Sequence, residues 1–418
     1  MQRRLTLAII SFLTSTLLAA STEWSQWRGH NRDGKSTDTG LLKEWPAGGP
    51  RLSWKSTDVG AGYASVSASG NSLFTTGDKG GDSYVMALSP ADGKLLWQTK
   101  IGKAGAPGWG GFSGPRCTPT VAGELVVAVD QWGDLACVDA ATGKEQWRKN
   151  YEKDFGAKRP EWGFAESPLA DDNRVIVTPG GKQGAIVALN LKTGETLWRS
   201  KAFTDDAQYS SAVVAVIGGV RQYIQLTMES LVGVAADDGR VLWQAKRKGS
   251  TAVIPDPIVA GDRIYVSSGY GTGCNLFKVS GTGPFSVAQV YANKVMVNHH
   301  GGVVKEGDHV YGYSDSKGWT CQNLQTGEAV WVNKEKLKKG SIAFADGMLY
   351  CREEADQNKT AKGTVALLEA TPAGLKEKGR FDPPDRSDKH SWSHPVITGG
   401  KLLLRDQEVL LCYDVKAK

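Results

Sequence analysis

The chain has 418 residues, of which 40% are hydrophobic and 22% charged, so it can bury a large core and intrinsic disorder is excluded as its general state. The formal net charge of +6 comes from 50 basic and 44 acidic residues that are interspersed along the chain. Because no basic tract stands apart from the acidic residues, the composition argues against a nucleic-acid-binding protein.

Residues 1–21 have the organisation of a secretory signal peptide. A basic start at Arg3 and Arg4 precedes an apolar run from Leu5 to Ala20, and small residues follow at the expected cleavage point. A short membrane anchor is the alternative, but this run is marginal for spanning a bilayer. No cysteine follows the run, and no later segment is long and apolar enough to be transmembrane. We therefore expect an exported protein, periplasmic or extracellular.

Residues 22–48 form an extension ahead of the repeats. Three tryptophans, Trp24, Trp27 and Trp45, lie within it. Because exposed tryptophans in a loose tail would be poorly tolerated, we expect this extension to pack on the main domain, residues 49–418.

An eleven-residue motif recurs through the main domain. Its seventh residue is Gly and its eleventh is Trp in five gapless segments: Ala87–Trp97, Cys137–Trp147, Ala188–Trp198, Gly233–Trp243 and Cys321–Trp331. An Asp or Asn followed by Thr-Gly or Asp-Gly is typical of a tight hairpin, and the Trp strand after it is placed to pack between neighbouring sheets. Two further strands with a Gly turn precede each motif, so each repeat predicts a four-stranded antiparallel sheet.

The motif tryptophans are spaced by 50, 51, 45 and 88 residues, and the last interval holds one degenerate repeat around Phe277–Tyr291. Four strands at this period are typical of a β-propeller blade. The last repeat, at the C-terminus, supplies only three strands, whereas Arg51–Ser56 is a Trp strand with no blade before it. We therefore predict an all-β fold: an eight-bladed propeller of four-stranded antiparallel blades whose last blade is closed by this N-terminal strand.

The repeat resembles that of the pyrroloquinoline quinone (PQQ) repeat propellers, the family of quinoprotein alcohol dehydrogenases and of the BamB-like scaffold of the outer-membrane β-barrel assembly machinery. The segment Trp24–Ser36 (WSQWRGHNRDGKS) is similar to a leader found in PQQ-like propellers exported by planctomycete and verrucomicrobial bacteria. The resemblance covers nearly all of the chain after residue 21, and it implies a propeller fold more specifically than it implies a function.

In a propeller, the first residues of the innermost strands surround the mouth of the central channel. Polar and aromatic side chains gather at these places, which predicts a site for a small polar or anionic ligand, or for a metal if two His and Glu166 converge. Small polar residues are also expected in a channel without a ligand. Since His299 and His300 are adjacent, we expect only one of them to face the channel. The candidate residues are Tyr63, Arg116, Glu166, Tyr209, His299, His300, Trp392 and His394.

The resemblance to quinoprotein dehydrogenases implies PQQ and calcium as candidate cofactors. Those enzymes hold PQQ between a Trp and a disulfide of adjacent cysteines, with calcium held by Glu, Asn and Asp. None of the six cysteines here is adjacent to another; Glu166 and Asn298 match two of the calcium ligands, with no Asp clearly joining them. We therefore expect no required cofactor, and most of the cysteines to be buried and small, although a Cys117–Cys137 bridge stays open.

Two functions remain. The first is a binding or scaffold propeller for a protein, a polymer or a small ligand, supported by the missing clamp and by aromatic loops at Trp109, Trp132 and Trp319 that we expect to be exposed. The second is a periplasmic oxidoreductase of the quinoprotein type, or a hydrolase, working in the channel. The His, Arg and Glu residues at the channel mouth favour this second function.

Overall fold

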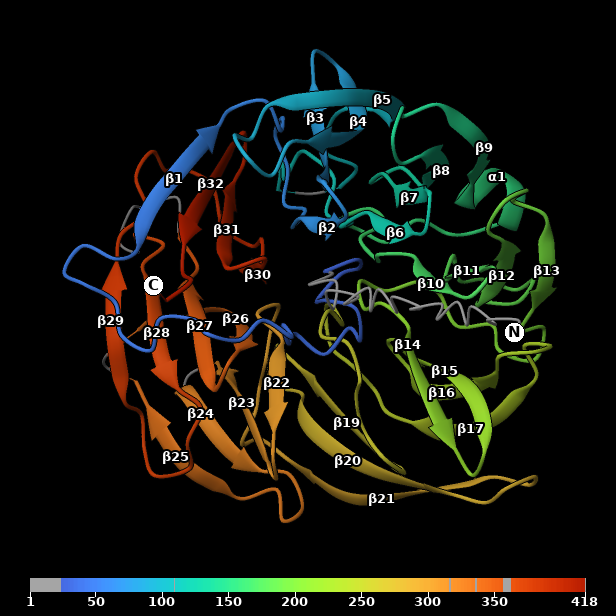
Figure 1. Ribbon diagram of the computed structural model, residues 1–418. Coiled ribbons are helices and arrows are strands. Elements are labelled where there is room, and N and C mark those ends of the chain that lie inside the picture. The colour runs from blue at the N-terminus through green and yellow to red at the C-terminus, as the bar shows by residue number, and fades with distance from the viewer. Residues whose placement is uncertain (1–23, 109, 316, 335–336, 356–361, 418) are drawn as a thin grey trace, which may run out of the picture.

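Eight four-stranded antiparallel sheets stand in a ring around a central channel (Figure 1). The computed structural model describes residues 24–108, 110–315, 317–334, 337–355 and 362–417. The all-β, eight-bladed prediction is confirmed. Within the described ranges, no helix has the length and apolar character needed to cross a membrane. The signal-peptide prediction, residues 1–21, lies outside the described residues.

The first four blades run from the inner to the outer strand in chain order. Blade 1 is β2 (Ser67–Ser69), β3 (Ser72–Lys79), β4 (Asp82–Leu88) and β5 (Leu95–Lys103); blade 2 is β6 (Thr120–Ala122), β7 (Leu125–Val129), β8 (Asp134–Asp139) and β9 (Glu145–Asn150); blade 3 is β10 (Leu169–Asp171), β11 (Arg174–Val177), β12 (Val187–Asn190) and β13 (Thr196–Arg199); blade 4 is β14 (Val213–Ile217), β15 (Val220–Leu226), β16 (Ser230–Ala235) and β17 (Val241–Lys246). A single turn of helix, α1 (Tyr151–Phe155), follows blade 2.

The remaining blades complete the ring. Blade 5 is β18 (Ile258–Ala260), β19 (Arg263–Ser268), β20 (Gly273–Ser280) and β21 (Ser286–Asn293); blade 6 is β22 (Val303–Glu306), β23 (His309–Ser314), β24 (Gly318–Asn323) and β25 (Ala329–Asn333); blade 7 is β26 (Gly340–Ala345), β27 (Met348–Glu353), β28 (Val365–Glu369) and β29 (Glu377–Phe381); blade 8 is β30 (Val396–Thr398), β31 (Lys401–Asp406) and β32 (Val409–Asp414) with β1 (Arg51–Ser56) outermost. The predicted closure is confirmed, since β1 pairs antiparallel with β32 (Figure 1).

The motif holds neighbouring blades together as well as forming a turn. In blade 2, the Asp139 carboxylate accepts hydrogen bonds from the backbone N–H and the hydroxyl of Thr142, at 2.8 and 2.6 Å. Gly143 follows with φ of 72°, and a Cβ there would lie 2.6 Å from the indole ring of Trp97 in blade 1. The Trp97 indole N–H donates to the Ala140 carbonyl in the same turn. The Gly therefore gives the turn its left-handed backbone and leaves room for the tryptophan of the preceding blade.

The degenerate repeat keeps this arrangement with a different side chain. Tyr291 on β21 takes the place of Trp, donating its hydroxyl to the Leu324 carbonyl and lying against Gly327. An aromatic ring with a hydrogen-bond donor is thus retained where the tryptophan is lost.

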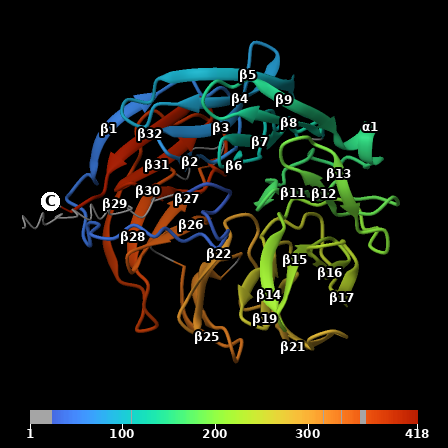
Figure 2. The same ribbon diagram turned by 45° about the vertical axis from the view of Figure 1, so that its right-hand side comes forward.

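Residues 24–38, here called the channel segment, lie inside the ring (Figures 1 and 2). The inner strands have free edges there, and the channel segment hydrogen-bonds to the inner part of all eight blades. Its bonds reach the backbone or side chains of Ala68, Val121, Ala170, Ala212, Asp256, Val303, Phe344 and His394, in blades 1 to 8 respectively. The segment therefore occupies the channel and satisfies polar groups on strand edges that would otherwise lack partners.

Candidate functional site

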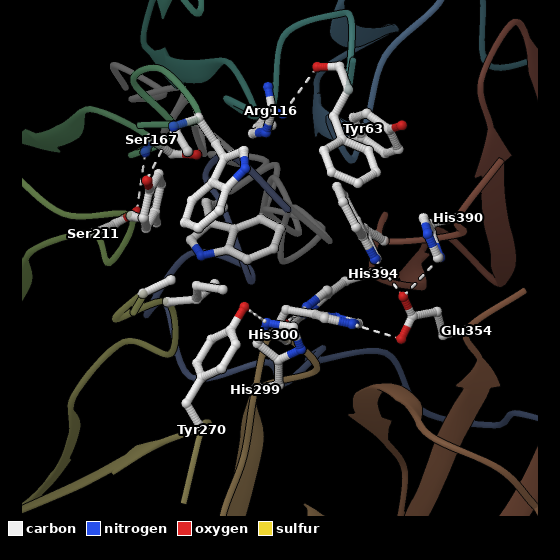
Figure 3. Close-up of a pocket in the computed structure, with 18 residues that line it drawn as sticks. Tyr63, Arg116, Ser167, Ser211, Tyr270, His299, His300, Glu354, His390 and His394 are labelled. Atoms are coloured by element: carbon white, nitrogen blue, oxygen red, sulfur yellow. Dashed lines mark hydrogen bonds and ion pairs between the residues drawn. The ribbon is translucent and has the colours of Figure 1, made fainter. Parts of the chain in front are cut away.

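A cavity of about 390 Å³ lies at the channel mouth where the inner strands begin (Figure 3). Its volume is within the range of small-molecule sites. Aromatic side chains and histidines dominate the wall, which is formed by Trp27, Tyr63, Phe112, Arg116, Trp162, Ala165, Ser167, Tyr209, Ser211, Ala252, Ile254, Tyr270, His299, His300, Glu354, His390, Trp392 and His394.

Seven of the eight candidate residues line this cavity, and Glu166 does not. Its buried carboxylate instead accepts hydrogen bonds from the Tyr151 hydroxyl and the Thr178 backbone N–H, both at 2.7 Å. Burial raises its pKa to about 7, against the opposing effect of these bonds. Glu166 lies outside the cavity because side chains alternate along an extended chain. Ala165 and Ser167 face the cavity, so Glu166 between them points away.

The expectation that only one of the adjacent histidines faces the channel was wrong. Both His299 and His300 line the cavity, with ring centroids 4.9 Å apart. The chain bends at these two residues instead of running extended, so the alternation that separates neighbouring side chains in a strand does not apply.

Trp392 is the centre of a continuous aromatic wall. The ring centroids of Tyr63 and Phe112 lie 4.6 and 5.0 Å from that of Trp392, and His390 stacks on it at 5.0 Å with planes 6° apart. Such contacts fix the rings against one another, and the surface they present is apolar and rigid.

Glu354 connects three of the wall residues. One carboxylate oxygen lies 2.9 Å from His300 Nε2, while the other accepts from the Trp392 indole N–H at 2.5 Å and lies 3.0 Å from His390 Nδ1 (Figure 3). Burial by itself would raise the pKa of Glu354, but His300, His390 and the more distant Lys339 hold that pKa well below its usual range. The carboxylate is therefore ionised and already fully engaged by its neighbours.

His299 and His394 stay neutral at physiological pH. Burial, then the nearby His300 and Lys339, lower the pKa of His299 to about 2, and burial followed by Arg28 lowers that of His394 well below its usual value. His299 Nε2 lies 2.8 Å from the Tyr270 hydroxyl. These rings therefore contribute shape and hydrogen bonding to the site, and no positive charge.

The channel segment forms the floor of the cavity. The Trp27 indole N–H donates to the Asp256 carboxylate at 2.7 Å, and its ring lies 4.5 Å from that of His394. The floor of the cavity therefore comes from residues that precede the first blade.

Sequence reasoning missed Glu354 and Tyr270. Glu354 directly follows β27 and Tyr270 lies just beyond β19, so each comes after the second strand of its blade. Because the second strand runs antiparallel to the first, its end reaches the same face as the start of the inner strand. Polar residues after the second strands were thus a usable signal.

Three other expectations have clear outcomes. Trp319 is not exposed: it is 1% exposed on β24, in edge contact with Tyr313. Trp132 is half-buried between the cations of Lys103 and Arg159, and Trp109 lies outside the described residues. All six cysteines are free and buried, so there is no Cys117–Cys137 bridge.

The residues do not fit the quinoprotein clamp or its calcium site. No two cysteines are adjacent, and Glu166 is used by Tyr151 and Thr178. The Asn298 amide donates to the Gly302 and Tyr313 carbonyls. Over the part of the chain that the structure describes, no group of three or more His, Cys, Asp or Glu is arranged to hold a metal ion.

Solved structures of other propellers share this fold. BamB from Moraxella catarrhalis superposes with a TM-score of 0.60 at 14% identity, over 85% of this chain and 95% of that one. Quinohemoprotein alcohol dehydrogenase from Comamonas testosteroni gives 0.65 at 12% identity, over 95% of this chain and 81% of that one. Identities this low show the fold alone.

Curated relatives are similar over part of their length. BamB of Burkholderia pseudomallei is 27% identical over 208 residues, 49% of this chain and 48% of that protein. BamB of Escherichia coli is 24% identical over 200 residues, 46% of this chain and 45% of that protein. The chain thus spans about half the length of the curated relatives it matches. The family model for the outer membrane protein assembly factor BamB matches residues 81–333, more than half of the chain. The protein therefore belongs to the BamB family of PQQ-like repeat propellers.

Proposed function

We propose that this protein is an exported binding propeller that holds a small ligand in the aromatic cavity at its channel mouth. One observation carries the proposal: the cavity presents rigid aromatic faces while its carboxylate and most of its hydrogen-bonding groups are already engaged within the protein. A preformed aromatic pocket with few convergent polar groups is typical of a binding site. The location rests on the signal-like residues 1–21.

A scaffold role for a protein partner is the second candidate. The curated relatives are named as outer membrane protein assembly factors, and the family match supports a comparable role for this chain. The partner would then be a protein, and a small ligand would not be required.

The quinoprotein alternative, an oxidoreductase holding PQQ in the channel, has less support. The dehydrogenase neighbours share the fold at 12% identity, and the clamp residues implied by that resemblance do not fit. Among the described residues that line the cavity there is no cysteine to take the place of the adjacent cysteines that would lie against the quinone.

A ligand screen by thermal shift tests the binding proposal. The mature chain, Trp392→Ala and Leu197→Ala are screened against small aromatic acids, neutral aromatic compounds, sugars, and PQQ with calcium. We expect stabilisation of the wild type and of Leu197→Ala, whose side chain is exposed on β13, and loss of that stabilisation in Trp392→Ala. Failure of every compound to stabilise the wild type would refute a small-ligand function, and stabilisation by PQQ with calcium alone would favour the quinoprotein alternative.

A further inference from the structure

Arg116 is a half-buried cation in the cavity wall, and it forms no ion pair with the residues that the structure describes. It directly precedes the buried Cys117 ahead of β6, and it lines the cavity. Burial lowers its pKa, and only Tyr63, Tyr209 and the more distant Asp78 oppose that effect. Within the described ranges, no carboxylate lies within 4 Å of its guanidinium. A cation that has lost part of its contact with water without gaining a counter-charge is destabilised, and a bound anion would offset that cost.

Toward the residues that the structure describes, the Arg116 guanidinium donates only two hydrogen bonds. Its Nη1 and Nη2 donate to the Gly114 and Phe112 carbonyls, each at 3.0 Å, whereas guanidinium carries five N–H groups. Arg405, buried in the core nearby, donates to five backbone carbonyls and one hydroxyl. Arg405 is therefore saturated by the protein, while Arg116 is oriented by two carbonyls and, among the described residues, has no partner for its other N–H groups.

The surroundings of Arg116 define the rest of the ligand. Its guanidinium carbon lies 5.5 Å from the centre of the Tyr63 ring (Figure 3). The Tyr63 ring contacts that of Trp392, which in turn contacts Phe112. A flat or apolar body would lie against this wall when its anionic group reaches Arg116.

The charge of the cavity limits the ligand to a single anionic group. Glu354, the one carboxylate among the described lining residues, is ionised and lies 2.9 Å from His300 and 3.0 Å from His390, whereas His299 and His394 are neutral. His300 and His390 are already engaged by Glu354, so a second carboxylate on the ligand would compete with Glu354 for them and would be repelled by it.

We propose that the cavity binds an aromatic monocarboxylate, with the carboxylate paired to Arg116 and the ring held by Tyr63, Trp392 and Phe112. This inference rests on the proposed binding function and names the ligand class for it. The planar guanidinium suits a carboxylate because two parallel N–H groups can meet its two oxygens.

Calorimetric titration of the mature chain tests the proposal with three probes of one shape: 2-naphthoate, its neutral amide 2-naphthamide, and naphthalene-2,6-dicarboxylate. We expect 2-naphthoate to bind about tenfold or more tightly than the amide, since charge-assisted hydrogen bonds distinguish them. The dicarboxylate is expected to bind more weakly than the monocarboxylate. In Arg116→Gln the ratio of the amide's dissociation constant to that of the acid should fall to near one, while Arg116→Lys should keep part of the wild-type ratio.

Arg240→Gln is the matched control, because Arg240 is exposed on the outer side of blade 4 and pairs with Asp238. Circular dichroism and melting temperature establish that each variant is folded. Equal affinity for acid and amide in the wild type, an unchanged preference in Arg116→Gln, or tighter binding of the dicarboxylate would overturn the proposal.

The two proposals fail in different ways. If only neutral compounds bind, and Trp392→Ala abolishes their binding while Arg116→Gln does not, the binding function holds and the carboxylate assignment is wrong. If no compound of the screen or of this series binds to the wild type, both are wrong.

Discussion

Arg32 connects the channel segment to two blades, and its replacement measures what that segment contributes to stability. The fully buried guanidinium donates to the carbonyls of Ser167, Pro168 and Ala212, at 2.8, 2.6 and 2.7 Å. Arg32→Met keeps most of the apolar volume and leaves three buried carbonyls without this donor. Each unsatisfied acceptor costs about 1–3 kcal/mol, partly offset because the guanidinium no longer has to be desolvated.

We expect a net loss of about 4 kcal/mol in the free energy of unfolding. With an unfolding entropy of about 2.1 cal/mol/K per residue and about 400 residues, this corresponds to a fall of about 5 °C in melting temperature. Differential scanning calorimetry of the mature chain measures it.

Arg240→Met is the control, because that exposed side chain pairs only at the surface with Asp238 and should change the melting temperature by less than about 1 °C. If Arg32→Met melted within about 1 °C of the wild type, the hydrogen bonds of the channel segment would not stabilise the ring, and the reasoning would be refuted.

Three further predictions concern buried groups. Gly34→Ala should lower the free energy of unfolding by about 1–3 kcal/mol, because Gly34 has φ of +78° and a Cβ there would lie 2.7 Å from Arg28 Nη2. Gly40→Ala is the control: Gly40 has φ of +68° and a Cβ there would have nothing within 4 Å, so a denaturation assay of both variants should show a smaller loss for it. Burial raises the pKa of Glu166 from 4.5 to about 7, so folding favours its protonated form. The melting temperature of the wild type should therefore fall relative to that of Glu166→Gln as pH rises from about 4.5 to about 7. A difference between the two melting temperatures that stays constant over that range would contradict this. Thiol titration should find six thiols in the denatured, unreduced protein and almost none in the native protein, and any smaller denatured count would reveal a disulfide.

The blades could be predicted because their signals are local. The turn at Asp139, Thr142 and Gly143 carries its own hydrogen bonds and its own left-handed residue, and Trp97 meets it one repeat away. The incomplete last blade and the unpaired Trp54 strand identified the closure, since a ring can have only as many outer strands as blades. Even the degenerate repeat kept an aromatic residue, Tyr291, in the outer strand.

The place of the cavity could be predicted from the sequence, whereas the side chains that line it could be predicted only in part. The starts of the inner strands converge in any propeller, which placed seven of the eight candidate residues at the cavity. Glu166 was misplaced because strand alternation turns it away. His299 and His300 both line the cavity, and the expectation that only one would face it was wrong because the chain bends there. Glu354 was missed because it follows the second strand, whose end was not considered.

The eight blades can be read from the repeat period, the turn residues and the outer aromatic residues, because those interactions join residues within one repeat or in adjacent repeats. The closure follows from counting strands, since the last repeat lacks one and Arg51–Ser56 supplies it. The chemistry of the channel, in contrast, depends on side chains that come together only in the folded ring. The cavity wall combines Trp27 from the channel segment with residues of blades up to 367 positions away, such as His394. Whether a side chain there is engaged, as Glu354 is, or keeps unused donors, as Arg116 does, depends on neighbours that meet only when the ring closes.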